Sequence, residues 1–185
     1  MADKEFLDDC IDKINTDQIR QWVRNWLYEK TPDYFWTIPS SSSGKYHPSY
    51  GQGEGGLARH TKAAFYIALD LLDRGLVQFR EVERDIILAS ILIHDTFKKG
   101  QGEVHSRADH PKLVYDEIIK EGCDEGSVRN RIAKCVASHM GQWNKDYKTG
   151  KEINAKPETE MEEFVHLCDY LASRKYLEFN FDAVK

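Results

Sequence analysis

The sequence predicts an all-α protein. Apolar residues recur at helical spacing in one segment after another, and no segment of useful length alternates between apolar and polar residues as a half-buried strand does. Hydrophobic residues make up 41% of the 185 positions, which is enough for a real core and argues against extensive disorder. The length suits one domain with short extensions.

The N-terminal region is expected to be helical over residues 3–30, in two pieces, with Trp22 and Trp26 on one face. Thr31 and Pro32 end this region, because the residue before a proline is disfavoured in the helical conformation. A long loop rich in Ser and Gly follows over 37–56 and contains Lys45 and His47. Loops of this length inside a compact domain are often functional.

Five further helices are expected after this loop. They cover Leu57–Arg74, Val82–Phe97, Asp109–Glu121, Ser127–Met140 and Thr159–Tyr176. The second of them is apolar almost all round, which is typical of a central, buried helix. Gly75 and Gly122 act as C-terminal stops, and Thr159 with Glu162 forms a capping box at the start of the last helix.

The charge balance excludes some classes of function. The chain has 26 Lys and Arg against 31 Asp and Glu, a formal net charge of −5, which argues against a broad face for nucleic-acid backbones. No apolar run approaches the ~20 residues needed to span a bilayer, and the charged N-terminus lacks the apolar core of a signal peptide. Four scattered cysteines without a CxxC pair are typical of a reduced protein. We therefore expect a cytoplasmic protein with no membrane partner.

Several His and Asp residues stand where core helices should be apolar. His94 and Asp95 come at the end of the most hydrophobic helix, and a carboxylate buried there is costly unless it is paired or bound to a metal. Four other expected helices contribute one residue each: His60, His110, His139 and Asp169. One such residue is usually a hydrogen-bonded core side chain, but five helices together indicate convergence on a common point. Imidazole and carboxylate ligands suit Zn, Fe, Mn, Ni or Co.

Three short stretches around these residues form an ordered pattern. They read GGLARHT at 55–61, LIHDTFK at 92–98 and HLCDYL at 166–171. Together they resemble the HD-domain metal-dependent phosphohydrolases, from about Lys45 to Ala172. The likeness is closest to the HD domains of bacterial 3′-to-5′ exoribonucleases and of small HD hydrolases, which also have a histidine before the GGL element, as His47 is here. Phe97 stands where a glycine is common in that family.

The resemblance implies an HD-domain-like helical bundle with metal ligands on several helices. A first divalent ion would be held by His60, His94, Asp95 and Asp169, and a second by Asp95 as a bridge together with His110 and His139. One or two ions are expected, from among Mn, Fe, Zn, Ni, Co and Mg.

The resemblance also places other residues in the site. Asp95 and Lys98 are expected to carry the chemistry, because Lys98 follows His94 by one turn and could reach a phosphate oxygen. Lys45, His47 and Arg59 are expected to contact the substrate. In this reading residues 1–36 are N-terminal helices packed on the domain, 37–176 form the HD phosphohydrolase domain, and 177–185 are a C-terminal tail.

The function implied is hydrolysis of a phosphomonoester or phosphodiester of a nucleotide-like small molecule by metal-activated water. A single-stranded nucleic-acid exonuclease or phosphodiesterase is one alternative, and the acidic balance weighs against it. A non-catalytic, nucleotide-binding regulatory protein is another, and the intact ligand set argues against it. The sequence leaves the oligomeric state open.

Overall fold

The fold is all-α, as expected. The computed structural model describes residues 3–41, 44, 47–100 and 106–177, and within these ranges it contains seven α-helices, short 3-10 and π turns and no strand. An isolated bridge joins Lys145 and Glu152 in the segment before the last helix. No helix in these ranges is both long and apolar enough to cross a membrane.

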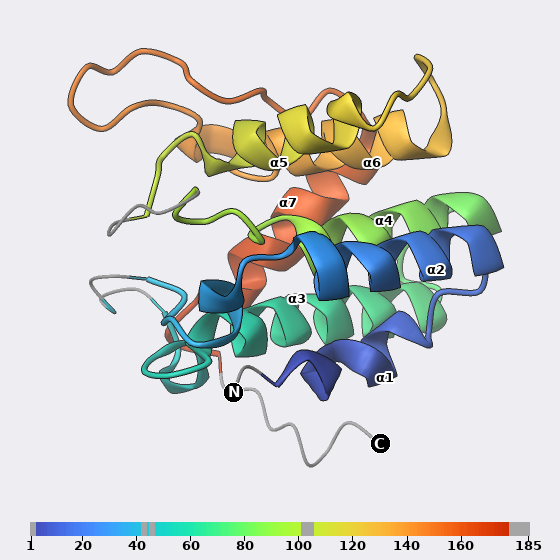
Figure 1. The fold of residues 1–185 in the computed structure, drawn as a ribbon, viewed down its shortest axis with the longest axis horizontal. Coiled ribbons are helices and arrows are strands. Elements are labelled where there is room, and N and C mark those ends of the chain that lie inside the picture. Colours follow the sequence, from blue (N-terminus) through green and yellow to red (C-terminus); the bar gives the residue numbers. More distant parts are fainter. Residues whose placement is uncertain (1–2, 42–43, 45–46, 101–105, 178–185) are drawn as a thin grey trace.

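The helices lie in layers. In Figure 1, α5 and α6 form one side, α3 and α1 form the opposite side, and α4 and α2 lie between them while α7 crosses behind. The bounds are Asp8–Ile11 for α1, Asp17–Asn25 for α2, Gly56–Asp73 for α3, Glu81–Ile93 for α4, His110–Lys120 for α5, Val128–Ser138 for α6 and Glu160–Ala172 for α7.

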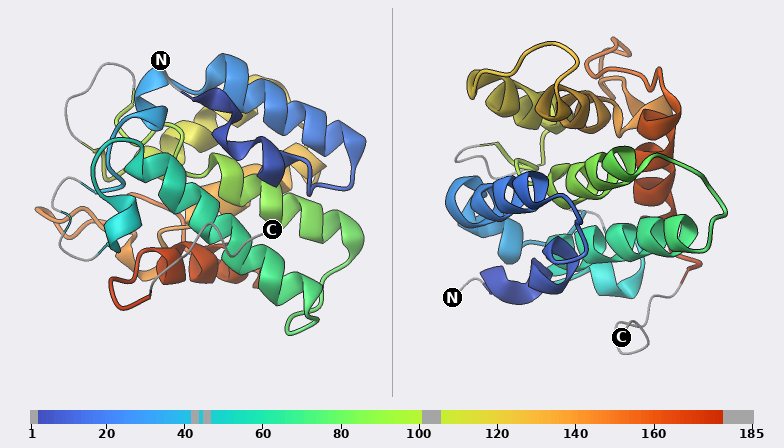
Figure 2. Two further views of the ribbon diagram at one scale, coloured as in Figure 1. Left: turned by 90° about the horizontal axis from the view of Figure 1, so that it is seen from below. Right: turned by 90° about the vertical axis from the view of Figure 1, so that its right-hand side faces the viewer.

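Helix α4 is the central element. It contacts α2, α3, α6 and α7, and the two further views in Figure 2 show it enclosed by its neighbours. Every residue from Asp85 to Ile93 is buried. The nearly uniform apolar sequence of this helix therefore places its C-terminal end in the middle of the molecule.

The end of α4 differs from the expectation. The helix stops at Ile93, so the prediction that it continues to Phe97 is wrong. Both the amide and the hydroxyl of Thr96 donate to the Ile93 carbonyl, at 3.1 and 2.8 Å, which tightens the chain into a turn. His94 caps the helix, and Asp95 already lies in the turn.

The two N-terminal helices pack on α3 and α4. The carboxylate of Asp85 on α4 is fully buried and accepts hydrogen bonds from the backbone amides of Asn15 and Thr16, at 3.1 and 2.7 Å. Arg84 pairs with the same carboxylate at 3.3 Å. The start of α2 is thus fixed to the central helix by a charged acceptor.

Candidate metal centre

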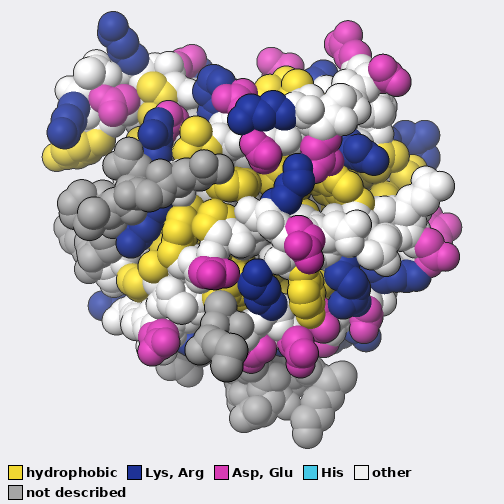
Figure 3. All heavy atoms as spheres, viewed as in Figure 1, with side chains coloured by type: hydrophobic (Ala, Val, Ile, Leu, Met, Phe, Trp, Pro, Cys, Tyr) yellow, Lys and Arg dark blue, Asp and Glu magenta, His cyan; other side chains and the backbone are white. Residues whose placement is uncertain are grey.

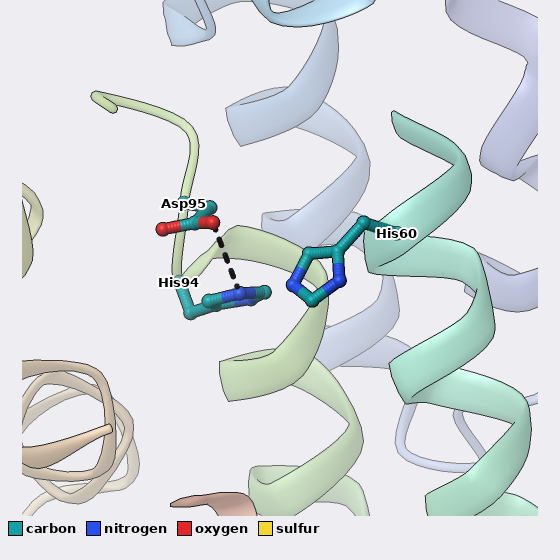
Figure 4. A group of neighbouring side chains, drawn as sticks. All are labelled: His60, His94 and Asp95. Carbon is teal, nitrogen blue, oxygen red and sulfur yellow. Dashed lines mark ion pairs between the residues drawn. The ribbon is translucent and has the colours of Figure 1, made fainter. Parts of the chain in front are cut away.

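The structure brings all six residues of the predicted ligand set together. His94 and His139 are the C-caps of α4 and α6, and His110 is the first residue of α5. His60 and Asp169 come from inside α3 and α7. Figure 4 shows His60 on α3 pointing toward His94, with Asp95 on the turn beside it. All of these side chains are buried except that of Asp169, which is 19% exposed.

Three groups in this cluster have ligand atoms within 4.8 Å of one another. They are His60, His94 and Asp95; His94, His139 and Asp169; and Asp95, His110 and His139. The groups share members, so the cluster is continuous from α3 to α5.

The backbone fixes the orientation of three imidazoles. The Nδ1–H groups of His94, His110 and His139 each donate to a carbonyl three residues earlier, at 2.7 Å: those of Ile91, Arg107 and Val136. A carbonyl only accepts, so Nδ1 must carry the hydrogen in each ring. In the neutral form of these rings, Nε2 then presents a lone pair to the cluster, as a metal ligand does.

The lone pairs face one another at short range. The Nε2 atoms of His110 and His139 are 3.2 Å apart, and Nε2 of His94 is buried without a hydrogen-bond partner among the described residues. Acceptor atoms this close repel each other unless a cation, either a proton or a metal ion, lies between them. The donor set of imidazole nitrogen and carboxylate oxygen fits a divalent metal ion.

The carboxylate of Asp95 faces two sides of the cluster. Its Oδ1 lies 2.8 Å from His110 Nε2 and 3.6 Å from His139 Nε2, whereas its Oδ2 lies 3.5 Å from His94 Nε2. Lys98 Nζ pairs with both oxygens, at 3.0 and 2.8 Å. The two oxygens of Asp95 therefore face different histidines, Oδ1 toward His110 and His139 and Oδ2 toward His94, as a bridge requires.

The second carboxylate, that of Asp169, lies at the end of the cluster near His60. Asp169 Oδ1 lies 2.8 Å from His60 Nε2 and 3.5 Å from His94 Nε2. Burial opposes ionisation of Asp169, but its hydrogen bond with His60 and the nearby charge of His94 outweigh burial and hold its pKa well below the usual range. Burial likewise opposes ionisation of Asp95, and the charges of Lys98 and the neighbouring histidines hold its pKa well below the usual range. Both acids are therefore anionic.

The histidines divide between charged and neutral forms. Burial disfavours the charged form of His94, but Asp95 and Asp169 together raise its pKa to about 10. Burial and the positive charge on His94, with His110 nearby, lower the pKa of His139 to about 3. Without a metal, His94 therefore holds a proton on Nε2, at the position where a metal ion would bind.

The predicted substrate-contact residues have different surroundings. The ring of His47 lies 5.6 Å from that of His60, and burial, with His60 and Lys98 nearby, lowers the pKa of His47 to about 4. Arg59 donates to the carbonyls of Tyr50 and Gln52, at 2.7 and 2.8 Å, so its guanidinium ties the preceding loop to α3. Lys45 lies outside the described residues.

One supporting residue was not among the predicted ligands. His166 on α7 donates from Nδ1 to the carbonyl of His139, at 2.7 Å. Gly141 has φ +54°, and a Cβ there would lie 2.3 Å from His166 Nε2. The turn that follows His139 is thus packed directly on the His166 ring. The signal in the sequence was the i, i+3 spacing of His166 and Asp169.

Comparison with known proteins gives one match. A protein-family model described as HD domain matches residues 57–174. The matched stretch contains the whole cluster, from His60 to Asp169. No curated protein matches the chain, and neither does any solved structure.

Proposed function

The chain belongs to the HD domain family, whose members are in general metal-dependent hydrolases, and on that premise we propose that it is a phosphohydrolase acting on a nucleotide-like phosphomonoester or phosphodiester. The observation that carries the proposal is the convergence of three Nε2 atoms, those of His94, His110 and His139, on the two oxygens of Asp95. We also propose that the chain is most similar to the HD domains of bacterial 3′-to-5′ exoribonucleases and small HD hydrolases, and that it catalyses the same type of reaction.

The ligand roles follow from the two faces of Asp95. His60, His94, Asp95 and Asp169 would hold one divalent ion. His110 and His139 would hold a second with Asp95 as the bridge, and the 3.2 Å approach of their Nε2 atoms supports this role. When bound, such ions polarise phosphate oxygens and lower the pKa of water.

The protein's own side chains would then orient the substrate. The ammonium of Lys98 lies at the edge of the cluster on Asp95, where it would bind a phosphate oxygen and stabilise the negative charge that develops there. His47 lies beside His60 on the loop side and would limit access of water. Substrate contacts by Lys45 and Arg59 stay predictions.

The surface is consistent with a small substrate. On the face in Figure 3, described Lys and Arg side chains are interspersed with Asp and Glu and form no continuous basic stripe. A protein that binds the nucleic-acid backbone broadly needs such a stripe. The charge pattern of this face therefore favours a nucleotide over a polynucleotide as the substrate.

Elemental analysis of the purified full chain tests the proposal together with phosphate release from a panel of nucleoside monophosphates, cyclic nucleotides and short oligonucleotides. We expect bound divalent metal and turnover, and we expect Asp95→Ala to lose both. Asp70→Ala, an exposed acid on α3, is the matched control and should keep both. A fully active Asp95→Ala variant would overturn the proposal. Bound metal without product from any phosphoester would favour the regulatory alternative.

A further inference from the structure

We propose that Trp143 and Tyr170 form a stacking platform for the aromatic base of the substrate, directly beside the metal centre. This inference rests on the proposed function and deepens it, because it names the nucleoside part of the substrate. The platform consists of Trp143 at the end of the 3-10 turn Gly141–Trp143, Tyr170 on α7, and Arg174 just beyond the end of α7.

The three side chains are held in a stack. The rings of Trp143 and Tyr170 are nearly parallel, with an interplanar angle of 12° and centroids 5.4 Å apart. The guanidinium carbon of Arg174 lies 4.2 Å from the Tyr170 ring centre and 5.8 Å from that of Trp143. Aromatic pairs in the core cross edge to face instead, as Trp26 and Phe97 do at 86°. Parallel rings with a neighbouring guanidinium are the arrangement that accepts a flat base.

Trp143 differs from the other tryptophans in its exposure. It is 44% exposed, whereas Trp26 and Trp36 are buried. The indole N–H groups of Trp22 and Trp26 donate to Glu121 and Thr96, at 2.8 and 3.2 Å, whereas those of Trp36 and Trp143 have no hydrogen bond to any described residue. Of these last two side chains, only that of Trp143 is exposed. Packing on Tyr170 alone leaves this surface and this donor to solvent. A stacked ligand would cover the exposed ring surface and accept a hydrogen bond from the indole N–H.

The platform adjoins the metal ligands along both of its chain segments. Tyr170 directly follows Asp169, and Trp143 follows His139 by four residues. His166 connects the two segments, because its ring centre lies 5.8 Å from that of Trp143 and its Nδ1–H donates to the His139 carbonyl. In a nucleotide, only the sugar separates the base from the phosphate. A base on this platform is therefore compatible with a phosphate at the metal centre.

A cleft of about 610 Å³ opens beside the platform. Its lining includes Gln142 and Asn144, which precede and follow Trp143 in the sequence, and also His166. The side chain of Asn144 is buried, and its Oδ1 has no hydrogen-bond partner among the described residues. This oxygen could accept an N–H from a base. The volume falls in the range of small-molecule sites.

The rim of the cleft carries charges of both signs. Lys145 and Lys156 line it together with one acid, Glu163, and Lys156 also forms an ion pair with Glu152. Lys145 is the cation of this rim that could meet the phosphate of a ligand. Stacking surface, an unpaired acceptor and a lysine at the rim together match a nucleoside phosphate.

The test compares two ligands that differ only in the base. The indole N–H signals of the full-length, 15N-labelled protein are followed by NMR during titration with adenosine 5′-monophosphate or with ribose 5-phosphate. The signal of Trp143, identified by its loss in Trp143→Ala, should shift with the first ligand and stay with the second. Trp143→Ala should weaken binding of adenosine 5′-monophosphate about tenfold, the loss of one stacked base. Equal affinity of variant and wild type, or equal shifts with both ligands, would refute the platform.

Two further variants separate stacking from folding. Tyr147→Ala removes a 98% exposed aromatic ring from the same segment and should leave binding unchanged. Trp143→Phe keeps a flat ring and should retain most of the affinity, whereas Trp143→Leu, which is apolar but not aromatic, should behave as Trp143→Ala does. If Trp143→Leu and Trp143→Phe bind the nucleotide equally well, the indole serves only for packing and the proposal fails.

The two proposals fail separately. Release of phosphate from ribose 5-phosphate needs the metal centre and Lys98 but no base, so it tests hydrolysis of a phosphomonoester separately from the platform. Turnover of that compound with no response of Trp143 to adenosine 5′-monophosphate would refute only the platform. A selective response of Trp143 without turnover of any phosphoester would refute only the phosphohydrolase.

Discussion

Replacing Gly141 by alanine tests how closely the turn after His139 is fitted to α7. Gly141 has φ +54°, a region that costs a residue with a Cβ about 1–2 kcal/mol. The new Cβ would also lie 2.3 Å from His166 Nε2 and 2.4 Å from its Cε1. The His166 ring must therefore move, and its hydrogen bond to the His139 carbonyl, worth about 1 kcal/mol, is lost.

Two effects are expected from Gly141→Ala. The free energy of unfolding should fall by about 2–3 kcal/mol, the sum of backbone strain and the lost hydrogen bond. Metal affinity should fall about tenfold or more, because outer contacts that hold a ligand in place typically contribute that much. Urea denaturation of the metal-free protein measures the first effect, and competition with a chelating dye measures the second.

Gly150→Ala is the matched control. Gly150 has a similar φ of +67°, but an added Cβ there would meet no atom within 4 Å. It should lose only the strain energy and keep wild-type metal affinity. If Gly141→Ala and Gly150→Ala have the same stability and the same metal affinity, then contact with His166 does not position His139 and the reasoning is refuted.

Three further predictions concern charge and metal. Lys98→Met should keep bound metal but lower kcat by roughly 10²–10³, as the loss of one charge-stabilising donor does; an unchanged kcat would leave Lys98 only its ion pair with Asp95. The side chain of Glu83 accepts hydrogen bonds from Arg80 and Arg131, which lower its pKa to about 2. Because the pKa of Glu83 is depressed in the folded protein, the stabilisation is complete above the unfolded value near 4.5 and is lost as pH falls toward 2; it amounts to on the order of 1 kcal/mol after screening. In Glu83→Gln the free energy of unfolding, measured with urea, should therefore depend less on pH over this window. An unchanged pH dependence would contradict the assignment. Removal of metal with a chelator should lower the melting temperature, and added metal at 100 times its Kd should restore about 2.7 kcal/mol; a melting temperature independent of metal would show that the cluster binds none.

The sequence predicts helices well where periodicity is strong. The order and type of the helices from α3 to α7 follow from apolar spacing and capping, because each of these helices packs its apolar residues into a common core. The last turn of the central helix does not follow, because Thr96 captures the Ile93 carbonyl through both its amide and its hydroxyl. Spacing alone does not reveal this competition.

The sequence likewise predicts the members of the cluster better than it predicts the contacts around them. The order of His60, His94, Asp95 and Asp169 along the chain anticipates that they meet, although their role as ligands stays a prediction. The stacking partner of Trp143 lies 27 residues later on another element, and no local pattern joins them. Arg59 has its partners in an irregular loop whose conformation the sequence does not specify.

The metal centre also has a consequence for the order of folding. Its parts come from five helices, and the contact between His60 and Asp169 closes a chain separation of 109 residues. Such distant contacts form slowly, after local helices, because the entropy of loop closure opposes them. The ion can therefore bind with full affinity only after the last helix has docked. The rate of metal uptake during refolding should therefore report the rate at which the bundle is completed. A chelator present from the start should leave the folding rate unchanged but increase the unfolding rate.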